Sequence, residues 1–131
     1  MPAFSRASRR RLATCDERLQ RVLRQAIRHV DFAVLEGHRS AKRQEALYRK
    51  GASQLRAGQS KHNAMPSLAV DVAPWPIDFR DRERFCYLAG FLMAIAAREG
   101  IRLRWGGDWD GDGLLADNRF DDLGHFELIE D

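Results

Sequence analysis

The chain has 131 residues, 44% of them hydrophobic and 31% charged, which predicts one globular domain over residues 1–131 and excludes a disordered chain. Its net charge of +3 suits an anionic partner but is too small to indicate nucleic-acid binding. No uninterrupted run of about 18 apolar residues is present in the sequence, so we do not expect a membrane span.

The N-terminal residues are basic. Residues 1–13 contain Arg6, Arg9, Arg10 and Arg11 but no apolar run after them, so they do not resemble a secretory signal peptide. We expect a flexible, solvated basic tail here. Cys15 and Cys86 match no metal-binding spacing and are expected to be free thiols.

Three helices are predicted from apolar residues that recur at helical spacing. The first follows Thr14, which with Glu17 fits a capping box. The second covers residues 41–50 and ends at Gly51, and the third begins after Asp81 and is the expected main core helix. Short strands are expected around residues 32–35, 68–72, 101–105 and 125–128.

Two of these strands place an acid and an imidazole on one face of the predicted sheet. Val70 and Val72 alternate with Asp71, so the aliphatic side chains face the core and the carboxylate faces the other way. The same parity puts His125 on the open face of its strand. His62 lies in a loop long enough to fold back over Asp71. One His beside an Asp is more often a hydrogen-bonded surface pair, but three such ligands with an open fourth position are typical of catalytic zinc.

Four short motifs connect these residues. They are Ser60-x-His62, Ala69-x-Asp71, Asp122-x-x-His125 and His125-x-Glu127. Together they resemble the M15 family of zinc peptidases, which includes D-Ala-D-Ala dipeptidases and carboxypeptidases and the phage endolysins that cut the L-alanyl-D-glutamate bond of peptidoglycan. The similarity runs from about Asp31 to Leu128. It implies one zinc ion, held by His62, Asp71 and His125.

The resemblance also implies a mechanism. Zinc lowers the pKa of its bound water and polarises the carbonyl of the bond that is cut. Asp122 is the expected general base, which takes the proton from that water and passes it to the leaving amine. Glu127 is the alternative base, or else an outer partner that orients a His ligand.

A further set of residues is expected at the substrate. By resemblance Arg39 contacts the substrate and the developing oxyanion, for which a permanently charged fork of donors is suited. Alternatively, Arg39 is a surface residue that pairs with Glu36 or Glu45. The same resemblance places Gln44 and Ser60 in the substrate-binding set.

Residues 105–113 form a segment rich in Gly and Asp. Three of its acids match the opening of an EF-hand loop, where alternate oxygens surround calcium: Asp108, Asp110 and Asp112. The match fails at the twelfth position, which holds Arg119 in place of Glu. Calcium in a different kind of loop is one expectation, and a rim of the substrate site that includes Trp105 and Asp108 is the other. Trp105 and Trp109 either line the peptide cleft or pack beneath this loop.

The expected fold class is α+β, with a small antiparallel sheet that carries the zinc site and about three helices packed against it. The expected activity is hydrolysis of the L-Ala–D-Glu bond in the stem peptide of bacterial peptidoglycan. The alternatives are a D,D-carboxypeptidase or D-Ala-D-Ala dipeptidase and, less in keeping with the intact motifs, a non-catalytic wall-binding module. We expect a monomer made in the host cytoplasm without a signal peptide, which acts on the wall after its release.

Overall fold

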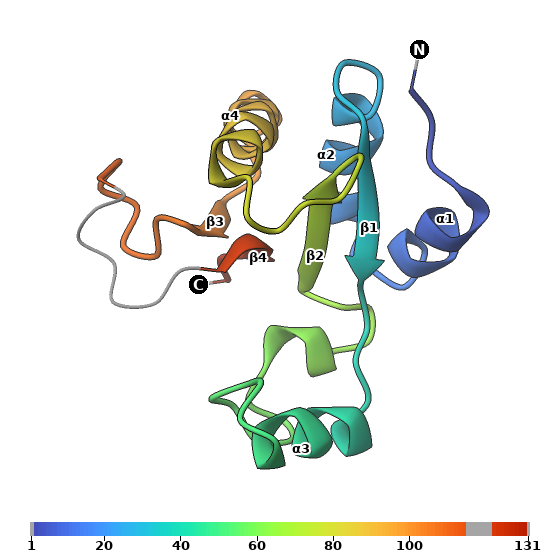
Figure 1. Ribbon diagram of the computed structural model, residues 1–131, viewed down its shortest axis with the longest axis vertical. Helices are drawn as coiled ribbons and strands as arrows, with labels where there is room; N and C mark the ends of the chain where they lie inside the picture. The colour runs from blue at the N-terminus through green and yellow to red at the C-terminus, as the bar shows by residue number, and fades with distance from the viewer. Residues whose placement is uncertain (1, 115–121, 131) are drawn as a thin grey trace.

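The computed structural model describes residues 2–114 and 122–130 and has the α+β architecture expected from the sequence. Its elements are α1 (Arg6–Leu12), α2 (Glu17–Ala26), β1 (Phe32–Glu36), α3 (Ala41–Arg49), the short 3-10 helix η1 (Lys61–Asn63), β2 (Ala69–Pro74), α4 (Arg82–Arg98), β3 (Leu103–Gly106) and β4 (Asp122–Leu128). Within these ranges the strands form one antiparallel sheet in the order β1-β2-β4-β3 (Figure 1). The prediction of a small antiparallel sheet is therefore confirmed, and α1 is added to the three expected helices.

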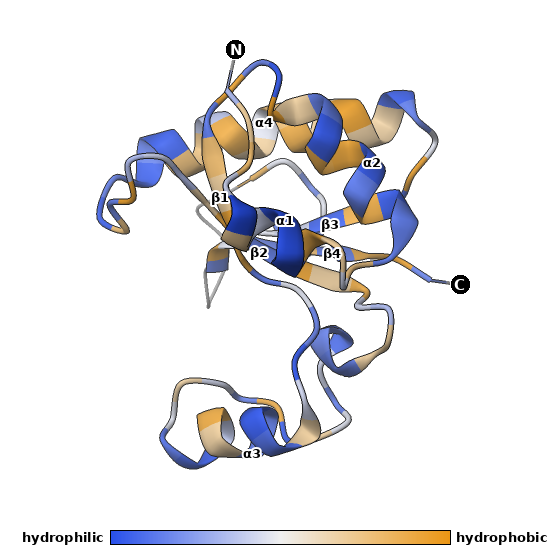
Figure 2. Ribbon diagram, turned by 90° about the vertical axis from the view of Figure 1, so that its right-hand side faces the viewer, coloured by the Kyte–Doolittle hydropathy of each residue, from blue (hydrophilic) through white to orange (hydrophobic). Residues whose placement is uncertain are grey.

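The core lies between the sheet and helices α2 and α4, which cover one of its faces (Figure 2). Leu19 and Leu23 of α2, Leu88 and Leu92 of α4 and Phe126 of β4 are almost completely buried there. Burial of a side chain of this size contributes about 1.5–3 kcal/mol. α3 lies on the other side of the sheet from α2 and α4 (Figure 2), beyond the end of β1 in Figure 1. No helix in the described part of the chain is long and apolar enough to span a membrane.

The N-terminal segment forms a helix, so the prediction of a flexible tail over residues 1–13 is wrong for α1. Leu12 is buried in the core, and Ser8 is only 2% exposed. The Ser8 hydroxyl accepts a hydrogen bond from Val34 N at 3.0 Å, and the Arg11 guanidinium donates to Val34 O at 3.1 Å. Because β1 is an edge strand, α1 pairs backbone groups that the sheet leaves open.

The predicted capping box at Thr14 is also wrong, because Asp16 caps α2. The Thr14 hydroxyl instead donates to Arg11 O at 2.6 Å and accepts from His38 N at 2.8 Å. Gly37 packs against Thr14, and a Cβ atom added to Gly37 would be 2.4 Å from Thr14 Oγ1. Only glycine fits here without displacing α1, and the Gly37 carbonyl has a direct role in the site described below.

Candidate active site

A cavity of about 570 Å³ lies between the open face of the sheet and the α3 segment. Its walls come from β2 and β4 on one side and from α3, residues 52–55 and η1 on the other. The three predicted metal ligands line it together with Asp122, Arg39 and Glu127. The fold therefore brings together residues that are up to 88 positions apart in the sequence.

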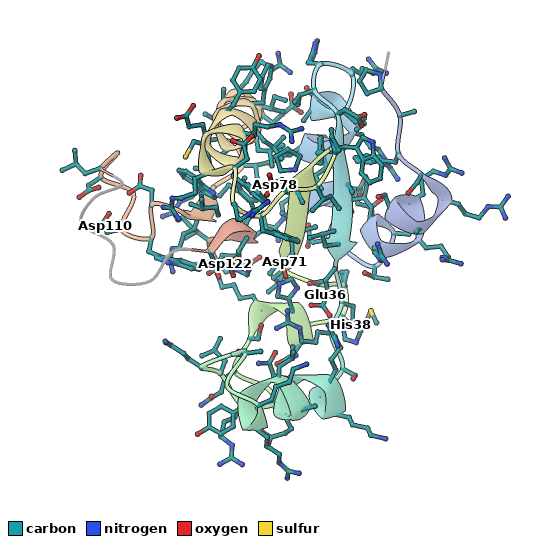
Figure 3. The ribbon with its side chains drawn as sticks, viewed as in Figure 1. Glu36, His38, Asp71, Asp78, Asp110 and Asp122 are labelled. Atoms are coloured by element: carbon teal, nitrogen blue, oxygen red, sulfur yellow. The ribbon has the colours of Figure 1, made fainter. Side chains whose placement is uncertain are left out.

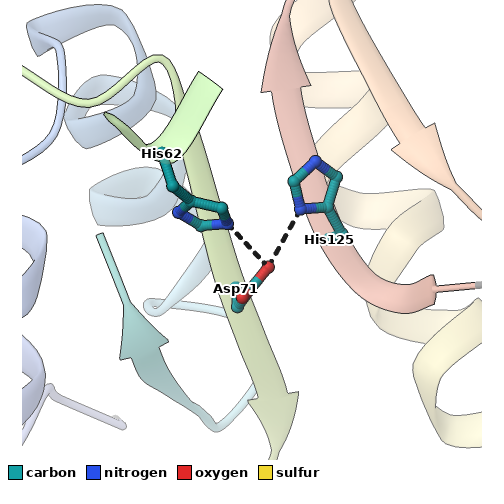
Figure 4. Close-up of side chains that lie close together, drawn as sticks. All are labelled: His62, Asp71 and His125. Carbon is teal, nitrogen blue, oxygen red and sulfur yellow. Dashed lines mark hydrogen bonds and ion pairs between the residues drawn. The ribbon is translucent and has the colours of Figure 1, made fainter. Parts of the chain in front are cut away.

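The predicted ligands converge on one carboxylate oxygen (Figure 4). Asp71 and His125 face each other directly in the register of β2 and β4, and their contact from His125 Nδ1 to Asp71 Oδ1 is 3.0 Å. His62 reaches the same oxygen from η1, with its Nε2 at 3.2 Å. The strand parity expected from the sequence is thus present, and the loop before β2 does fold back over Asp71.

The His62 ring is oriented by the backbone. Its Nδ1 lies 2.7 Å from Gly37 O, and the side chain is almost fully buried. A carbonyl oxygen only accepts hydrogen bonds, so Nδ1 carries the hydrogen and the lone pair of Nε2 points toward Asp71. The Ser60 hydroxyl accepts a hydrogen bond from His62 N at 3.1 Å, which fixes the backbone of η1 as well.

The His125 ring is oriented by a carboxylate. Its Nε2 lies 2.9 Å from Glu127 Oε1, so a hydrogen on Nε2 leaves the lone pair of Nδ1 for a metal ion. Glu127 Oε2 in turn lies 3.5 Å from Lys61 Nζ and 3.7 Å from Arg104 Nη1. Burial raises the pKa of Glu127, but the hydrogen bond from His125 and the charges of Lys61 and Arg104 outweigh it and leave this pKa lowered.

With these tautomers, both rings direct a nitrogen lone pair at the same anionic oxygen, an arrangement that requires a cation among them. The three ligand atoms lie within 4.8 Å of one another, and two His and one Asp are a suitable donor set for catalytic zinc. Without a metal ion, a proton bound to His125 supplies the positive charge. Burial lowers the pKa of His125, but hydrogen bonds with Asp71 and Glu127 raise it to about 9. Burial likewise opposes ionisation of Asp71, yet its contacts with His125 and His62 hold its pKa well below the usual range.

Asp122 is the first residue of β4 and lines the same cavity. Figure 3 shows it beside Asp71 at the end of the sheet that faces α3. Burial raises the pKa of the Asp122 carboxyl, and the negative charge of Asp71 raises it further, while His125 and Arg39 act in the opposite direction. A carboxylate with a raised pKa beside a metal site is the property that a general base requires.

Arg39 is in the cavity and not on the surface. Its side chain is 11% exposed, and Nη2 lies 2.5 Å from Glu36 Oε1 and 3.5 Å from Asp71 Oδ2. Nη1 donates to Gln44 Oε1 at 2.9 Å. The expected pairing of Arg39 with Glu36 is therefore present. The alternative pairing with Glu45 is not made, because Glu45 pairs with Arg56. The guanidinium also contacts the second oxygen of Asp71, a predicted metal ligand.

Gln44 is fully buried, so its side chain cannot contact a substrate directly in this structure. Its amide nitrogen donates to Ser53 Oγ at 3.0 Å and to Leu55 O at 2.6 Å, while its oxygen accepts from Arg39. Gln44 thus links Arg39 to the loop after α3. Ser60 does line the cavity, but its hydroxyl is used to cap η1.

The two tryptophans of the Gly- and Asp-rich segment differ in location. Trp105 belongs to the core: it is 7% exposed, donates from Nε1 to Leu123 O at 2.8 Å and stacks on Phe126. The expectation that Trp105 contacts the substrate is therefore wrong. Trp109 lines the cavity, with its ring centroid 5.5 Å from that of His125.

The carboxylates of Asp108, Asp110 and Asp112 lie within 4.8 Å of one another. Asp108 Oδ2 accepts a hydrogen bond from Gly113 N at 2.9 Å, and Asp112 Oδ1 accepts from Leu114 N at 2.8 Å. Asp108 is not among the residues that line the active-site cavity. Arg119, the twelfth position of the EF-hand comparison, lies outside the described residues.

Three residues of the site were missed by sequence reasoning. Gly37 orients His62, and Lys61 and Arg104 contact the carboxylate that orients His125. Lys61 and Arg104 resemble ordinary surface cations in the sequence, and only the pairing of β3 with β4 brings Arg104 opposite Glu127. The sequence signal available for Gly37 was its place at the end of a strand.

Comparison with known proteins agrees with the geometry. The family described as phage L-alanyl-D-glutamate peptidase matches residues 2–129. The L-alanyl-D-glutamate peptidase of Escherichia phage T5 is 32% identical over 135 residues, which cover 96% of this chain and 97% of that protein. The peptidoglycan L-alanyl-D-glutamate endopeptidase CwlK of Bacillus subtilis (strain 168) is 28% identical over 115 residues, which cover 76% of this chain and 62% of CwlK.

A solved structure shares the fold. The crystal structure of the Serratia marcescens L-Ala D-Glu endopeptidase ChiX superimposes with a TM-score of 0.76 and 31% sequence identity. The match covers 97% of this chain and 90% of ChiX.

Proposed function

Since this chain belongs to the phage L-alanyl-D-glutamate peptidase family, we propose that His62, Asp71 and His125 bind the zinc ion with which it cleaves its substrate. The chain is a peptidase that hydrolyses the bond between L-Ala and D-Glu in peptidoglycan. The observation that carries the zinc proposal is the orientation of the two rings, each held through its other nitrogen so that a lone pair meets Asp71.

Asp122 is proposed as the general base. When bound, zinc lowers the pKa of a water molecule and polarises the scissile carbonyl. Asp122 accepts a proton from that water as it attacks and donates it to the nitrogen of D-Glu, which leaves as an amine. Glu127 is held by His125, Lys61 and Arg104, which supports its role as the partner that orients His125 and not as the base.

The bond that is cut can be identified directly from the products. Digestion of purified peptidoglycan should expose a new amino terminus on D-Glu and leave L-Ala attached to the muramic acid, as detected by mass spectrometry of the fragments. Release of D-alanine alone would instead assign the chain to the carboxypeptidases, without affecting the zinc proposal.

Arg39 is proposed to stabilise the transition state, either by contact with the oxyanion or through its contact with Asp71. Arg39→Ala should therefore lower kcat more than it raises KM, as steady-state kinetics on a soluble muropeptide would show. Gln44→Ala is the matched variant, because it removes the neutral partner of the guanidinium and leaves the charge in place. A change confined to KM would limit Arg39 to ground-state binding of the substrate.

Calcium at Asp108, Asp110 and Asp112 stays a prediction: the three carboxylates lie close together, and exposed acidic groups often do so without an ion. Isothermal titration calorimetry with calcium on the zinc-loaded protein tests it, with Asp110→Asn as the variant that should lose any binding. A monomeric state and release from the host cytoplasm also stay predictions. Light scattering after size-exclusion chromatography would measure the first of these, and fractionation of producing cells the second.

A further inference from the structure

Helix α1 has an exposed basic face that its own interactions do not explain. The side chains of Arg6 and Arg10 are exposed, stand four positions apart on the same side of the helix, and make no hydrogen bond or ion pair with any described residue. Like charges at this spacing repel, and α1 contains no acidic residue. Arg6 also lies in the first turn, where the helix dipole opposes a positive charge.

These cations are held in a fixed position. α1 is attached to β1 by the hydrogen bonds of Ser8 and Arg11 to Val34, and Leu12 anchors it in the core. Figure 2 shows α1 as a mostly hydrophilic helix, and it packs beside β1. A flexible tail would only be solvated, whereas this helix presents two unpaired guanidinium groups at a constant place on the enzyme.

A cavity of about 370 Å³ lies between α1 and the end of β1, next to the active site. Arg10, Arg11 and Arg43 line it, and Glu36 is the one acid among its lining residues. Glu36 is already neutralised, because Arg39 contacts one of its oxygens and Arg43 the other at 2.6 Å. Glu36 and Arg43 also line the active-site cavity, so the two cavities adjoin across this ion pair.

We propose that the α1 basic face, formed by Arg6 and Arg10 with the adjoining cavity, binds carboxylates of peptidoglycan stem peptides other than the one being cut. This inference rests on peptidoglycan being the substrate. Glutamate has two carboxyl groups and the peptide chain uses one of them, so every stem peptide carries a free carboxylate near the scissile bond. Guanidinium groups match carboxylates in shape and charge.

The position of the face favours peptidoglycan over a nucleic acid. The basic cavity opens beside the catalytic cavity, where further stem peptides of the same polymer are present at high local concentration. The net charge of +3 is modest for a protein whose partner is a polyphosphate. The α1 basic face therefore holds the polymer close, and the groups around His125 and Asp122 carry out the cleavage.

The test compares two double variants that lose the same charge. Arg6→Gln/Arg10→Gln removes the proposed contacts, and Arg21→Gln/Arg28→Gln removes two exposed arginines of the α2 segment that likewise make no described ion pair. Binding to purified sacculi is measured by cosedimentation on ice at low salt, with Asp122→Asn present in every protein to limit cleavage. The α1 variant should bind about fivefold more weakly, and the control within about twofold of the parent.

Two further arms identify the group that is bound. On sacculi whose carboxylates have been converted to amides, the parent and the α1 variant should bind equally weakly. On sacculi stripped of attached phosphate polymers, the difference between them should persist. Equal losses for both double variants, or a difference that disappears after stripping, would overturn the proposal, the second by assigning the face to a phosphate polymer.

Turnover of a short soluble fragment distinguishes a failure of the α1 proposal from a failure of the assigned peptidase activity. With Asp122 restored, the α1 variant should cleave N-acetylmuramyl-L-Ala-D-Glu at the parental rate, because that fragment has no second stem peptide. Loss of this activity together with a lowered Tm would show a folding defect, and loss at an unchanged Tm would place Arg6 or Arg10 in catalysis; either result contradicts the proposed role. Failure of the parent itself to cleave the fragment would instead count against the assigned function.

Discussion

His125→Ala should leave the protein folded but without zinc and without measurable peptidase activity. The variant removes one of three ligands and also leaves Glu127 without its hydrogen-bond partner. Metal analysis of the purified protein should give about one zinc per parental chain and almost none for the variant. Chelation of the parent should abolish activity, and added zinc should restore it.

Two variants sharpen this test. His29→Ala removes an exposed imidazole that stacks on Phe91 and does not line the active-site cavity, so this variant should keep its zinc and its activity. Glu127→Gln keeps all three ligands but weakens the orientation of His125, for which about 10- to 100-fold weaker zinc binding is expected. A His125→Ala protein that still holds one zinc per chain would show that the ligand set is wrong.

The placement of Asp71 and His125 on one face could be predicted because strand parity is local. Val70 and Val72 bury their side chains against the core, so Asp71 between them must face the other side, and His125 follows in the same way from Phe126. The position of His62 does not follow from parity. It depends on the Gly37 carbonyl and the Ser60 cap, which meet only in the folded chain.

The same parity would have placed Trp105 correctly. Trp105 is two positions after Leu103 in β3, so both face the core, while Arg104 between them points toward Glu127. A substrate contact was expected for Trp105 because of its Gly- and Asp-rich neighbours, although the alternation in β3 predicts that it is buried. Trp109, outside the strand, is the tryptophan that reaches the cavity.

The errors at α1 and Gln44 have a different origin. α1 has too few apolar residues to show a helical period, and it is stable because Ser8 and Arg11 pair the open edge of β1. Gln44 was assigned to the substrate by resemblance, yet its burial is decided by the loop after α3, which supplies Ser53 and Leu55 as partners. Neither contact is encoded in the local sequence pattern.

Asp122→Asn should keep the zinc ion and lower kcat by about 10²-fold or more, the scale expected when a general base is lost. The amide preserves the shape of the side chain but cannot accept the proton of the attacking water. Zinc content and turnover of a soluble muropeptide are measured on the same preparation, so a loss of metal would instead identify Asp122 as a ligand.

The pH dependence of the rate separates this role from a structural one. Asp122 accepts a proton only as a carboxylate, so parental turnover should fall as the pH drops through the raised pKa of this group. The residual rate of Asp122→Asn should lack that acidic limb. Glu127→Gln should retain it, because Glu127 is bound by His125 and two cations and its pKa is lowered. Full turnover in Asp122→Asn, with the acidic limb lost in Glu127→Gln, would exchange the two assignments.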